Sequence, residues 1–155
     1  MMLTFAYGSN MSWNQMRERC PSSRFVGIAV LRDHKLAFTR ESVNRHCGVA
    51  DVVAEDGAHV WGVVYEIADL DVGKLDTSEG FRPGRDKNSY YRRECQFFLD
   101  GEDERPLTGS AYFGDRQPNP PLPNAAYKNL ILAGARHWHL PEEYIRELEQ
   151  IEVNG

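Results

Sequence analysis

Hydrophobic and polar residues alternate in several short stretches of the chain, and this period of two is typical of half-buried β-strands. The first stretch, residues 3–7, places Leu, Phe and Tyr at alternate positions. Residues 25–38 contain two apolar runs on either side of a polar Arg-Asp-His segment, which predicts two strands or one long bent strand. Two further strands are expected at residues 90–99 and 107–113, joined by an acidic turn.

A hairpin signal lies between these stretches. Runs rich in β-branched residues at 49–54 and 60–67 flank the sequence Glu-Asp-Gly-Ala. An Asp-Gly pair between two such runs strongly favours a hairpin. We therefore expect these two strands to pair with each other, and we expect six or seven strands in the whole chain.

Four segments have helical patterns. Ser12 is placed to cap a helix over residues 11–19, and Gln15, three residues later, would complete a capping box. Asp69 is expected to cap a short helix that runs toward residue 75. A third helix follows the proline-rich connector 117–123, and Pro141 suits the first position of a fourth.

The order of these elements predicts the fold class. Hairpins with helices at the start, middle and end of the chain are typical of α+β proteins. We expect one domain over residues 1–155, with a mixed or antiparallel sheet rolled into a small barrel and flanked by helices.

Composition and charge narrow the possible functions. The 155 residues are 41% hydrophobic, and no long apolar run or secretory leader is visible, so we expect a cytoplasmic protein without membrane contact. The net charge of −5, with both signs mixed along the chain, argues against a nucleic acid partner. Cys20, Cys47 and Cys95 are widely spaced and the histidines form no ligand motif, so we expect no disulfide framework, metal or cofactor.

The sequence Tyr7-Gly8-Ser9-Asn10 connects the first strand to the first helix. Glycine permits backbone conformations that other residues avoid, and successive N–H groups in such a turn can converge on one anion. The partial positive charge at the start of the next helix would favour a carboxylate there. A plain strand-to-helix turn has the same pattern, so this segment alone fits both a binding loop and an ordinary connection.

Glu79 follows the predicted short helix and precedes Gly80 and Phe81. A helix C-terminus carries partial negative charge, and partial burial there would raise the pKa of a glutamate. A carboxyl group with a raised pKa suits a general acid or base near neutral pH. An exposed glutamate before a capping glycine is the alternative, which the local sequence by itself favours.

Tyrosines are frequent in the second half of the chain. A tyrosine offers an apolar ring with one polar tip, which suits the binding of a small zwitterion. Core packing is the more common role for any single tyrosine. The candidates are Tyr90, Tyr91, Tyr112, Tyr127 and Tyr144.

Eight motifs follow one another along nearly the whole chain: Phe5–Met11, Val60–Tyr65, Leu75–Gly80, Tyr91–Arg93, Ala111–Tyr112, Tyr127, Gly134–Ala135 and Leu140–Tyr144. In this order they resemble the γ-glutamylcyclotransferase family, which includes the butirosin-pathway cyclotransferase and the AIG2-like plant proteins. One departure is the segment 82–89, which is longer than in many relatives and leaves Tyr90 as a rival to Tyr91 for the family's binding tyrosine.

The resemblance implies an intramolecular acyl transfer on a small γ-glutamyl substrate, with a place in glutathione metabolism. The α-amine of the γ-glutamyl group would attack its own γ-carbonyl, giving 5-oxoproline and a free amino acid or amine. Both reacting groups belong to one molecule, so the protein need only hold the reactive conformer. The implied site residues are Glu79 as general acid and base, with Tyr7, Gly8, Ser9, Asn10, Tyr91, Tyr112 and Tyr127 as substrate-binding residues.

Some alternatives stay open at this point. The leaving group is an amino acid or another amine, and the arginines of residues 82–89 are expected to decide between them. A non-catalytic binding or regulatory module of the same fold is the second hypothesis, which the presence of Glu79 weakens. Both a monomer and a homodimer fit the sequence.

Overall fold

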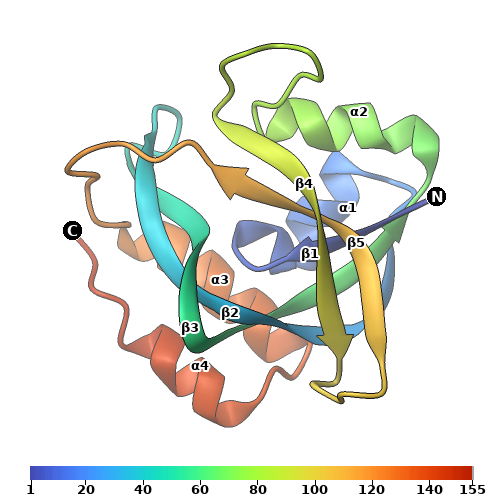
Figure 1. The fold of residues 1–155 in the computed structure, drawn as a ribbon. Helices are drawn as coiled ribbons and strands as arrows, with labels where there is room; N and C mark the ends of the chain where they lie inside the picture. The colour runs from blue at the N-terminus through green and yellow to red at the C-terminus, as the bar shows by residue number, and fades with distance from the viewer. Residues whose placement is uncertain (155) are drawn as a thin grey trace.

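A closed barrel of five strands forms the centre of the computed structural model, which describes residues 1–154 (Figure 1). The order around the barrel is β1-β3-β2-β4-β5, and β5 closes the barrel by pairing in parallel with β1. The predicted α+β class with a rolled sheet is confirmed, although the barrel has five strands and not six or seven. The strands are β1 (Met2–Ala6), β2 (Arg24–Ser42), β3 (Cys47–Ile67), β4 (Tyr90–Leu99) and β5 (Pro106–Gly114).

The two longest strands, β2 and β3, pair with each other over most of their length, so residues 25–38 form one long bent strand. The predicted hairpin at residues 56–57 is wrong. Residues 55–58 form a bulge opposite Asp33, whose carboxylate accepts a hydrogen bond from the Gly57 N–H at 3.0 Å. A bulge bends a strand without reversing it. The turn between β2 and β3 lies instead at residues 43–46, and both predicted strands pair with β2.

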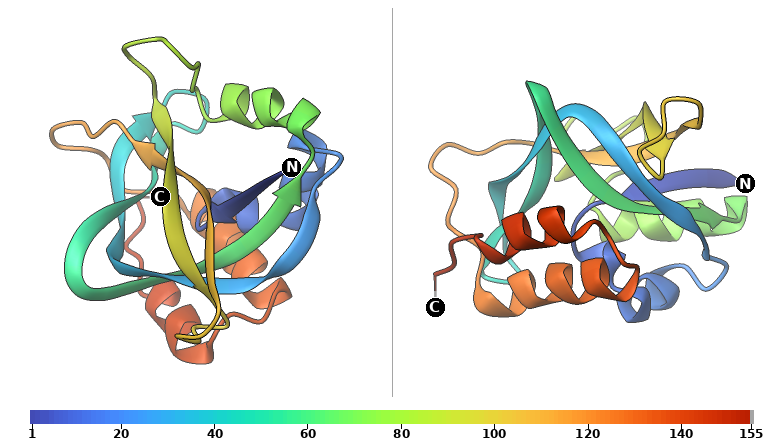
Figure 2. Two further views of the ribbon diagram at one scale, coloured as in Figure 1. Left: turned by 45° about the vertical axis from the view of Figure 1, so that its right-hand side comes forward. Right: turned by 90° about the horizontal axis from the view of Figure 1, so that it is seen from below.

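Four α-helices surround the barrel, and a short 3-10 helix, η1 (Ser9–Met11), precedes the first of them. The pair α3 and α4 packs side by side on one side of the barrel (Figures 1 and 2). Within residues 1–154, no helix has the length and apolar character needed to cross a membrane. The helices are α1 (Trp13–Arg19), α2 (Asp69–Ser78), α3 (Ala125–His137) and α4 (Glu142–Glu149).

The helix caps agree only in part with the sequence pattern. Ser12 caps α1 as predicted, because its side chain accepts a hydrogen bond from the Gln15 N–H. The prediction that Asp69 caps α2 is wrong, because Asp69 is the first residue of the helix and Ala68 occupies the cap position without a side-chain hydrogen bond. The Asp69 carboxylate lies 2.6 Å from the N-terminal ammonium group of Met1. Pro141 precedes α4 by one residue.

Helix α3 packs directly against η1 and so fixes the loop that follows β1. A Cβ atom at Gly134 would lie 2.5 Å from the Met11 backbone, so only glycine allows this approach. The Trp138 indole donates to the Met11 carbonyl at 2.9 Å, and the Tyr65 hydroxyl donates to the Asn10 carbonyl at 2.9 Å. These contacts hold the backbone of residues 10–11 in one position.

Candidate active site

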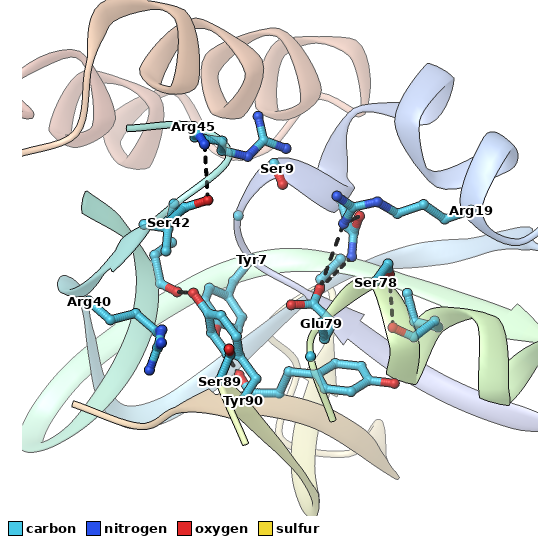
Figure 3. A pocket seen from close by; sticks show the side chains of 18 of the residues that line it. Tyr7, Ser9, Arg19, Arg40, Ser42, Arg45, Ser78, Glu79, Ser89 and Tyr90 are labelled. Atoms are coloured by element: carbon cyan, nitrogen blue, oxygen red, sulfur yellow. Dashed lines mark hydrogen bonds and ion pairs between the residues drawn. The ribbon is translucent and has the colours of Figure 1, made fainter. Parts of the chain in front are cut away.

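A cavity of about 480 Å³ lies where β1, the β2–β3 turn, the end of α2 and the start of β4 converge (Figure 3). This volume suits a small molecule. The cavity brings together residues that lie more than 100 positions apart in the sequence. Seven of the eight residues predicted for the site line it: Tyr7, Gly8, Ser9, Asn10, Glu79, Tyr112 and Tyr127.

Glu79 is the acidic group in the interior of this cavity. It follows the last residue of α2, and its side chain is 17% exposed. Burial raises the pKa of the Glu79 carboxyl above its usual value, while the Arg19 guanidinium and a hydrogen bond from Asn10 oppose that rise. The carboxyl therefore keeps a proton to higher pH than an exposed glutamate does.

Asn10 orients the Glu79 carboxylate. The Asn10 Oδ1 atom accepts hydrogen bonds from Gln15 Nε2 at 2.9 Å and from Arg19 Nη1 at 3.0 Å. These two donors leave the Asn10 Nδ2 group free to donate to Glu79 Oε1 at 2.9 Å. The Gln15 side chain is used here and on Ser9 Oγ, so it does not complete the predicted capping box.

The loop between β1 and α1 presents unused backbone donors. Among residues 1–154, no hydrogen bond uses the N–H groups of Gly8, Ser9 or Asn10. A Cβ atom at Gly8 would lie 3.2 Å from the Ala50 Cβ and 3.4 Å from the Tyr127 hydroxyl oxygen. Glycine therefore lets this loop approach β3 and α3 closely at the cavity wall.

Tyrosines form much of the remaining wall, and burial raises the pKa of each of them. The pKa of Tyr127 rises to about 12, and those of Tyr7, Tyr90 and Tyr112 also lie above the usual value. These side chains are therefore neutral hydrogen-bond donors near neutral pH. The Tyr127 hydroxyl accepts from the Ala50 N–H at 3.0 Å, and no group in residues 1–154 accepts its proton.

The structure places Tyr90, and not Tyr91, in the cavity wall. The Tyr90 hydroxyl donates to the Ala50 carbonyl, whereas the Tyr91 hydroxyl donates to the Asp86 carbonyl at 3.0 Å, away from the cavity. Adjacent residues of a strand point to opposite faces, so only one of the two can face inward. Tyr144 lies on the buried face of α4 and does not line the cavity.

A buried polar network behind Glu79 ties the end of α2 to the barrel. The Asp76 side chain is 6% exposed and lies 2.6 Å from Arg92 Nη1. Its other oxygen accepts a hydrogen bond from the Tyr112 hydroxyl at 2.6 Å, and Tyr7 donates to the Tyr112 carbonyl at 2.5 Å. Asp76 precedes Glu79 by three residues, so this network holds the turn that carries the carboxylate.

Three arginines that were not predicted for the site also line the cavity. Arg19 Nη1 lies 4.0 Å from Glu79 Oε1, while Arg40 and Arg45 have no carboxylate partner among residues 1–154. Arg19 could have been found, because it is four residues after Gln15 on one helix face. Arg40 lies near the end of β2 and Arg45 lies in the β2–β3 turn, a turn that the sequence pattern predicts at a different place. In the same described range, no cluster of His, Cys, Asp or Glu side chains has the arrangement of a metal site.

Comparison with known proteins gives one consistent result. Residues 4–139 match the family model described as gamma-glutamyl cyclotransferase, AIG2-like. The human and mouse γ-glutamylcyclotransferases are each 33% identical to this chain, over 98% of its length and 79% of theirs. A solved structure described as a gamma-glutamyl cyclotransferase superposes with a TM-score of 0.88 at 32% identity, covering 99% of this chain and 89% of the other.

Proposed function

Because the chain belongs to the γ-glutamyl cyclotransferase, AIG2-like family, we propose that it converts a γ-glutamyl amino acid or γ-glutamyl amine to 5-oxoproline. The α-amine nitrogen bonds to the γ-carbonyl carbon of the same molecule, and the bond from that carbon to the leaving nitrogen breaks. No metal or cofactor is needed in this scheme, since nucleophile and electrophile are both in the substrate. The observation that supports it most is the largely buried Glu79 beside the Tyr7–Asn10 loop.

Glu79 acts as the general base and then as the general acid. It removes a proton from the α-ammonium group so that the amine can attack, and it later delivers a proton to the leaving nitrogen. The hydrogen bond from Asn10 keeps the carboxylate in one orientation for both steps. A positioned acid–base group contributes roughly 10²- to 10⁴-fold, so Glu79→Gln is expected to lower kcat by about that factor.

The Tyr7–Asn10 loop and Tyr127 bind the substrate. The free N–H groups of residues 8–10 and the free Tyr127 proton are donors that suit either the substrate carboxylate or the oxyanion formed at the γ-carbonyl. If they stabilise the oxyanion, the loss of one donor costs roughly 3–4 kcal/mol of transition-state stabilisation. If they bind the carboxylate, the loss raises KM and leaves kcat nearly unchanged.

A substrate panel tests the proposal. The purified protein is incubated with γ-glutamyl amino acids and γ-glutamyl amines, and 5-oxoproline is measured by chromatography or NMR. We expect 5-oxoproline and the free amine in equal amounts from at least one compound. Compounds that bind in calorimetry but give no 5-oxoproline would contradict the proposal and favour a non-catalytic binding module.

A further inference from the structure

A second cleft adjoins the cavity, and it is strongly basic. Arg40 and Ser89 line both, so the two spaces are neighbours and border the same two residues. The cleft contains four cationic residues and one acidic residue, in a chain whose net charge is −5. Its lining residues are Arg40, Arg85, Lys87, Asn88, Ser89, Asp115, Arg116, Gln117 and Pro118.

Most of the charge in this cleft is available to a ligand. The Arg40 guanidinium donates to the Asp115 backbone carbonyl at 2.7 Å, which positions it without neutralising it. Neither Arg40 nor the exposed Lys87 forms an ion pair within residues 1–154. Arg116 is 60% exposed, and its Nε atom is 3.7 Å from the buried Asp51 carboxylate.

The loop that carries Lys87 is held in place by a buried side chain. Asn88 is 4% exposed, accepts hydrogen bonds from the Arg82 N–H and Arg85 Nε, and donates to the Arg85 carbonyl. The next residue, Ser89, donates its N–H to the carbonyl of Gly80, the residue that follows Glu79. The loop is therefore fixed relative to Glu79 as well as to the cleft.

We propose that this cleft binds the leaving group of the substrate and selects leaving groups that carry more than one carboxylate, such as an acidic amino acid or a short acidic peptide. The inference rests on the proposed function, which puts the scissile bond beside Glu79. In Figure 3, Arg40 lies beyond Tyr7 and Tyr90, on the side of Glu79 opposite Arg19. A leaving group that passes Ser89 would place its first carboxylate at Arg40 and its second near Lys87 and Arg116.

Three substrates that differ in leaving-group charge test this inference: γ-glutamyl-aspartate, γ-glutamyl-alanine and γ-glutamyl-alaninamide. We expect kcat/KM to fall in that order, with differences in KM and little change in kcat, because these contacts bind ground state and transition state alike. A hydrogen bond to a charged group corresponds to roughly a 10- to 100-fold change in KM, and an exposed ion pair to about fivefold or less. The preference for aspartate should shrink at high salt.

Two variants separate the two contacts. Arg40→Met should raise KM for the alanine compound and not for its amide, whereas Lys87→Met should affect only the aspartate compound. Arg17→Met, which removes an exposed arginine from α1, is the control and should change none of the three. The inference is overturned if the parent uses alaninamide as well as aspartate, or if Arg40→Met and Lys87→Met change all three substrates equally.

Binding measurements separate a failure of this inference from a failure of the proposed function. If neither these three compounds nor any other member of the γ-glutamyl panel yields 5-oxoproline, the proposed reaction is wrong, and calorimetric affinities for the three compounds then test the cleft. Tighter binding of the aspartate compound that is lost in Lys87→Met supports the cleft as an anion site. Equal affinity for the three compounds overturns it.

Discussion

The charge of Arg19 is expected to set the acidic limit of activity. Arg19 Nη1 lies 4.0 Å from Glu79 Oε1, and its side chain is 26% exposed. A base works only when it is ionised, so kcat/KM falls as the pH drops through the Glu79 pKa. The guanidinium stabilises the ionised form, and Arg19→Met should therefore raise the Glu79 pKa and move the acidic limb of the profile to higher pH.

The size of this effect follows from the distance. Two unit charges 4 Å apart interact by about 1 kcal/mol in water and about 4 kcal/mol at an effective dielectric constant of 20. Both side chains are partly exposed, so we use the lower figure as the minimum. At pH values below the pKa of Glu79, the ionised fraction of Glu79 should be at least about fivefold lower in Arg19→Met than in the parent, and kcat/KM should fall by the same factor.

The assay is the pH dependence of 5-oxoproline formation from the best substrate of the panel. Arg19→Lys keeps the positive charge and should restore most of the profile, and Arg17→Met on the same helix should leave it unchanged. A uniform loss of activity at every pH in Arg19→Met, with the acidic limb in place, would show that Arg19 acts only by holding Asn10 and would refute the electrostatic reasoning.

Three further predictions concern stability. Gly134→Ala forces a Cβ to within 2.5 Å of η1 and should lower the free energy of unfolding, measured by urea denaturation, by about 1–3 kcal/mol. In Gly73→Ala the new Cβ meets no atom within 4 Å, so this control should raise the free energy of unfolding by about 0.5–1 kcal/mol. Equal effects of the two substitutions would contradict the close packing of α3 on η1. Asp76→Asn leaves Arg92 without its carboxylate partner and should cost roughly 3 kcal/mol in the same assay, and a loss below 0.5 kcal/mol would mean that the network is unimportant. Hydrogen bonds from Ser22, and then Lys74, hold the pKa of the Asp71 carboxyl below its usual value. The ionised carboxylate therefore stabilises the fold above the unfolded-state pKa, and this contribution is lost as the pH falls. Asp71→Asn should flatten the dependence of the free energy of unfolding on acidic pH, and an unchanged slope would contradict this assignment.

Local signals explain which parts of the fold could be predicted. The alternation in β1, the Ser12 cap and the change from strand to helix at Gly8 all lie within a few residues, so the sequence pattern identified them. The Asp56-Gly57 pair gave a wrong prediction because the Gly57 backbone serves a bulge opposite Asp33 as well as it would serve a turn. A turn and a bulge differ in which strand lies alongside, and that is a tertiary property.

The same distinction holds for the site. Glu79 and the Tyr7–Asn10 loop carry recognisable chemistry in short segments, and the fold brings them into hydrogen-bond contact. Alternation in β4 requires Tyr90 and Tyr91 to face opposite ways, but the sequence does not say which face is the interior. Arg40 reaches the cavity only because the long β2–β3 hairpin turns at residues 43–46, so its role depends on pairing that no local pattern revealed.

The activity of Glu79→Gln shows whether this carboxylate carries the proton transfers. The rate of 5-oxoproline formation and the calorimetric affinity for the same substrate are compared for the parent, Glu79→Gln and Glu143→Gln, an exposed glutamate on α4 that serves as the control. We predict that kcat falls by roughly 10²- to 10⁴-fold in Glu79→Gln while substrate affinity stays within a few fold, and that the control matches the parent. A Glu79→Gln protein as active as the parent would contradict the assignment of the proton transfers to this residue.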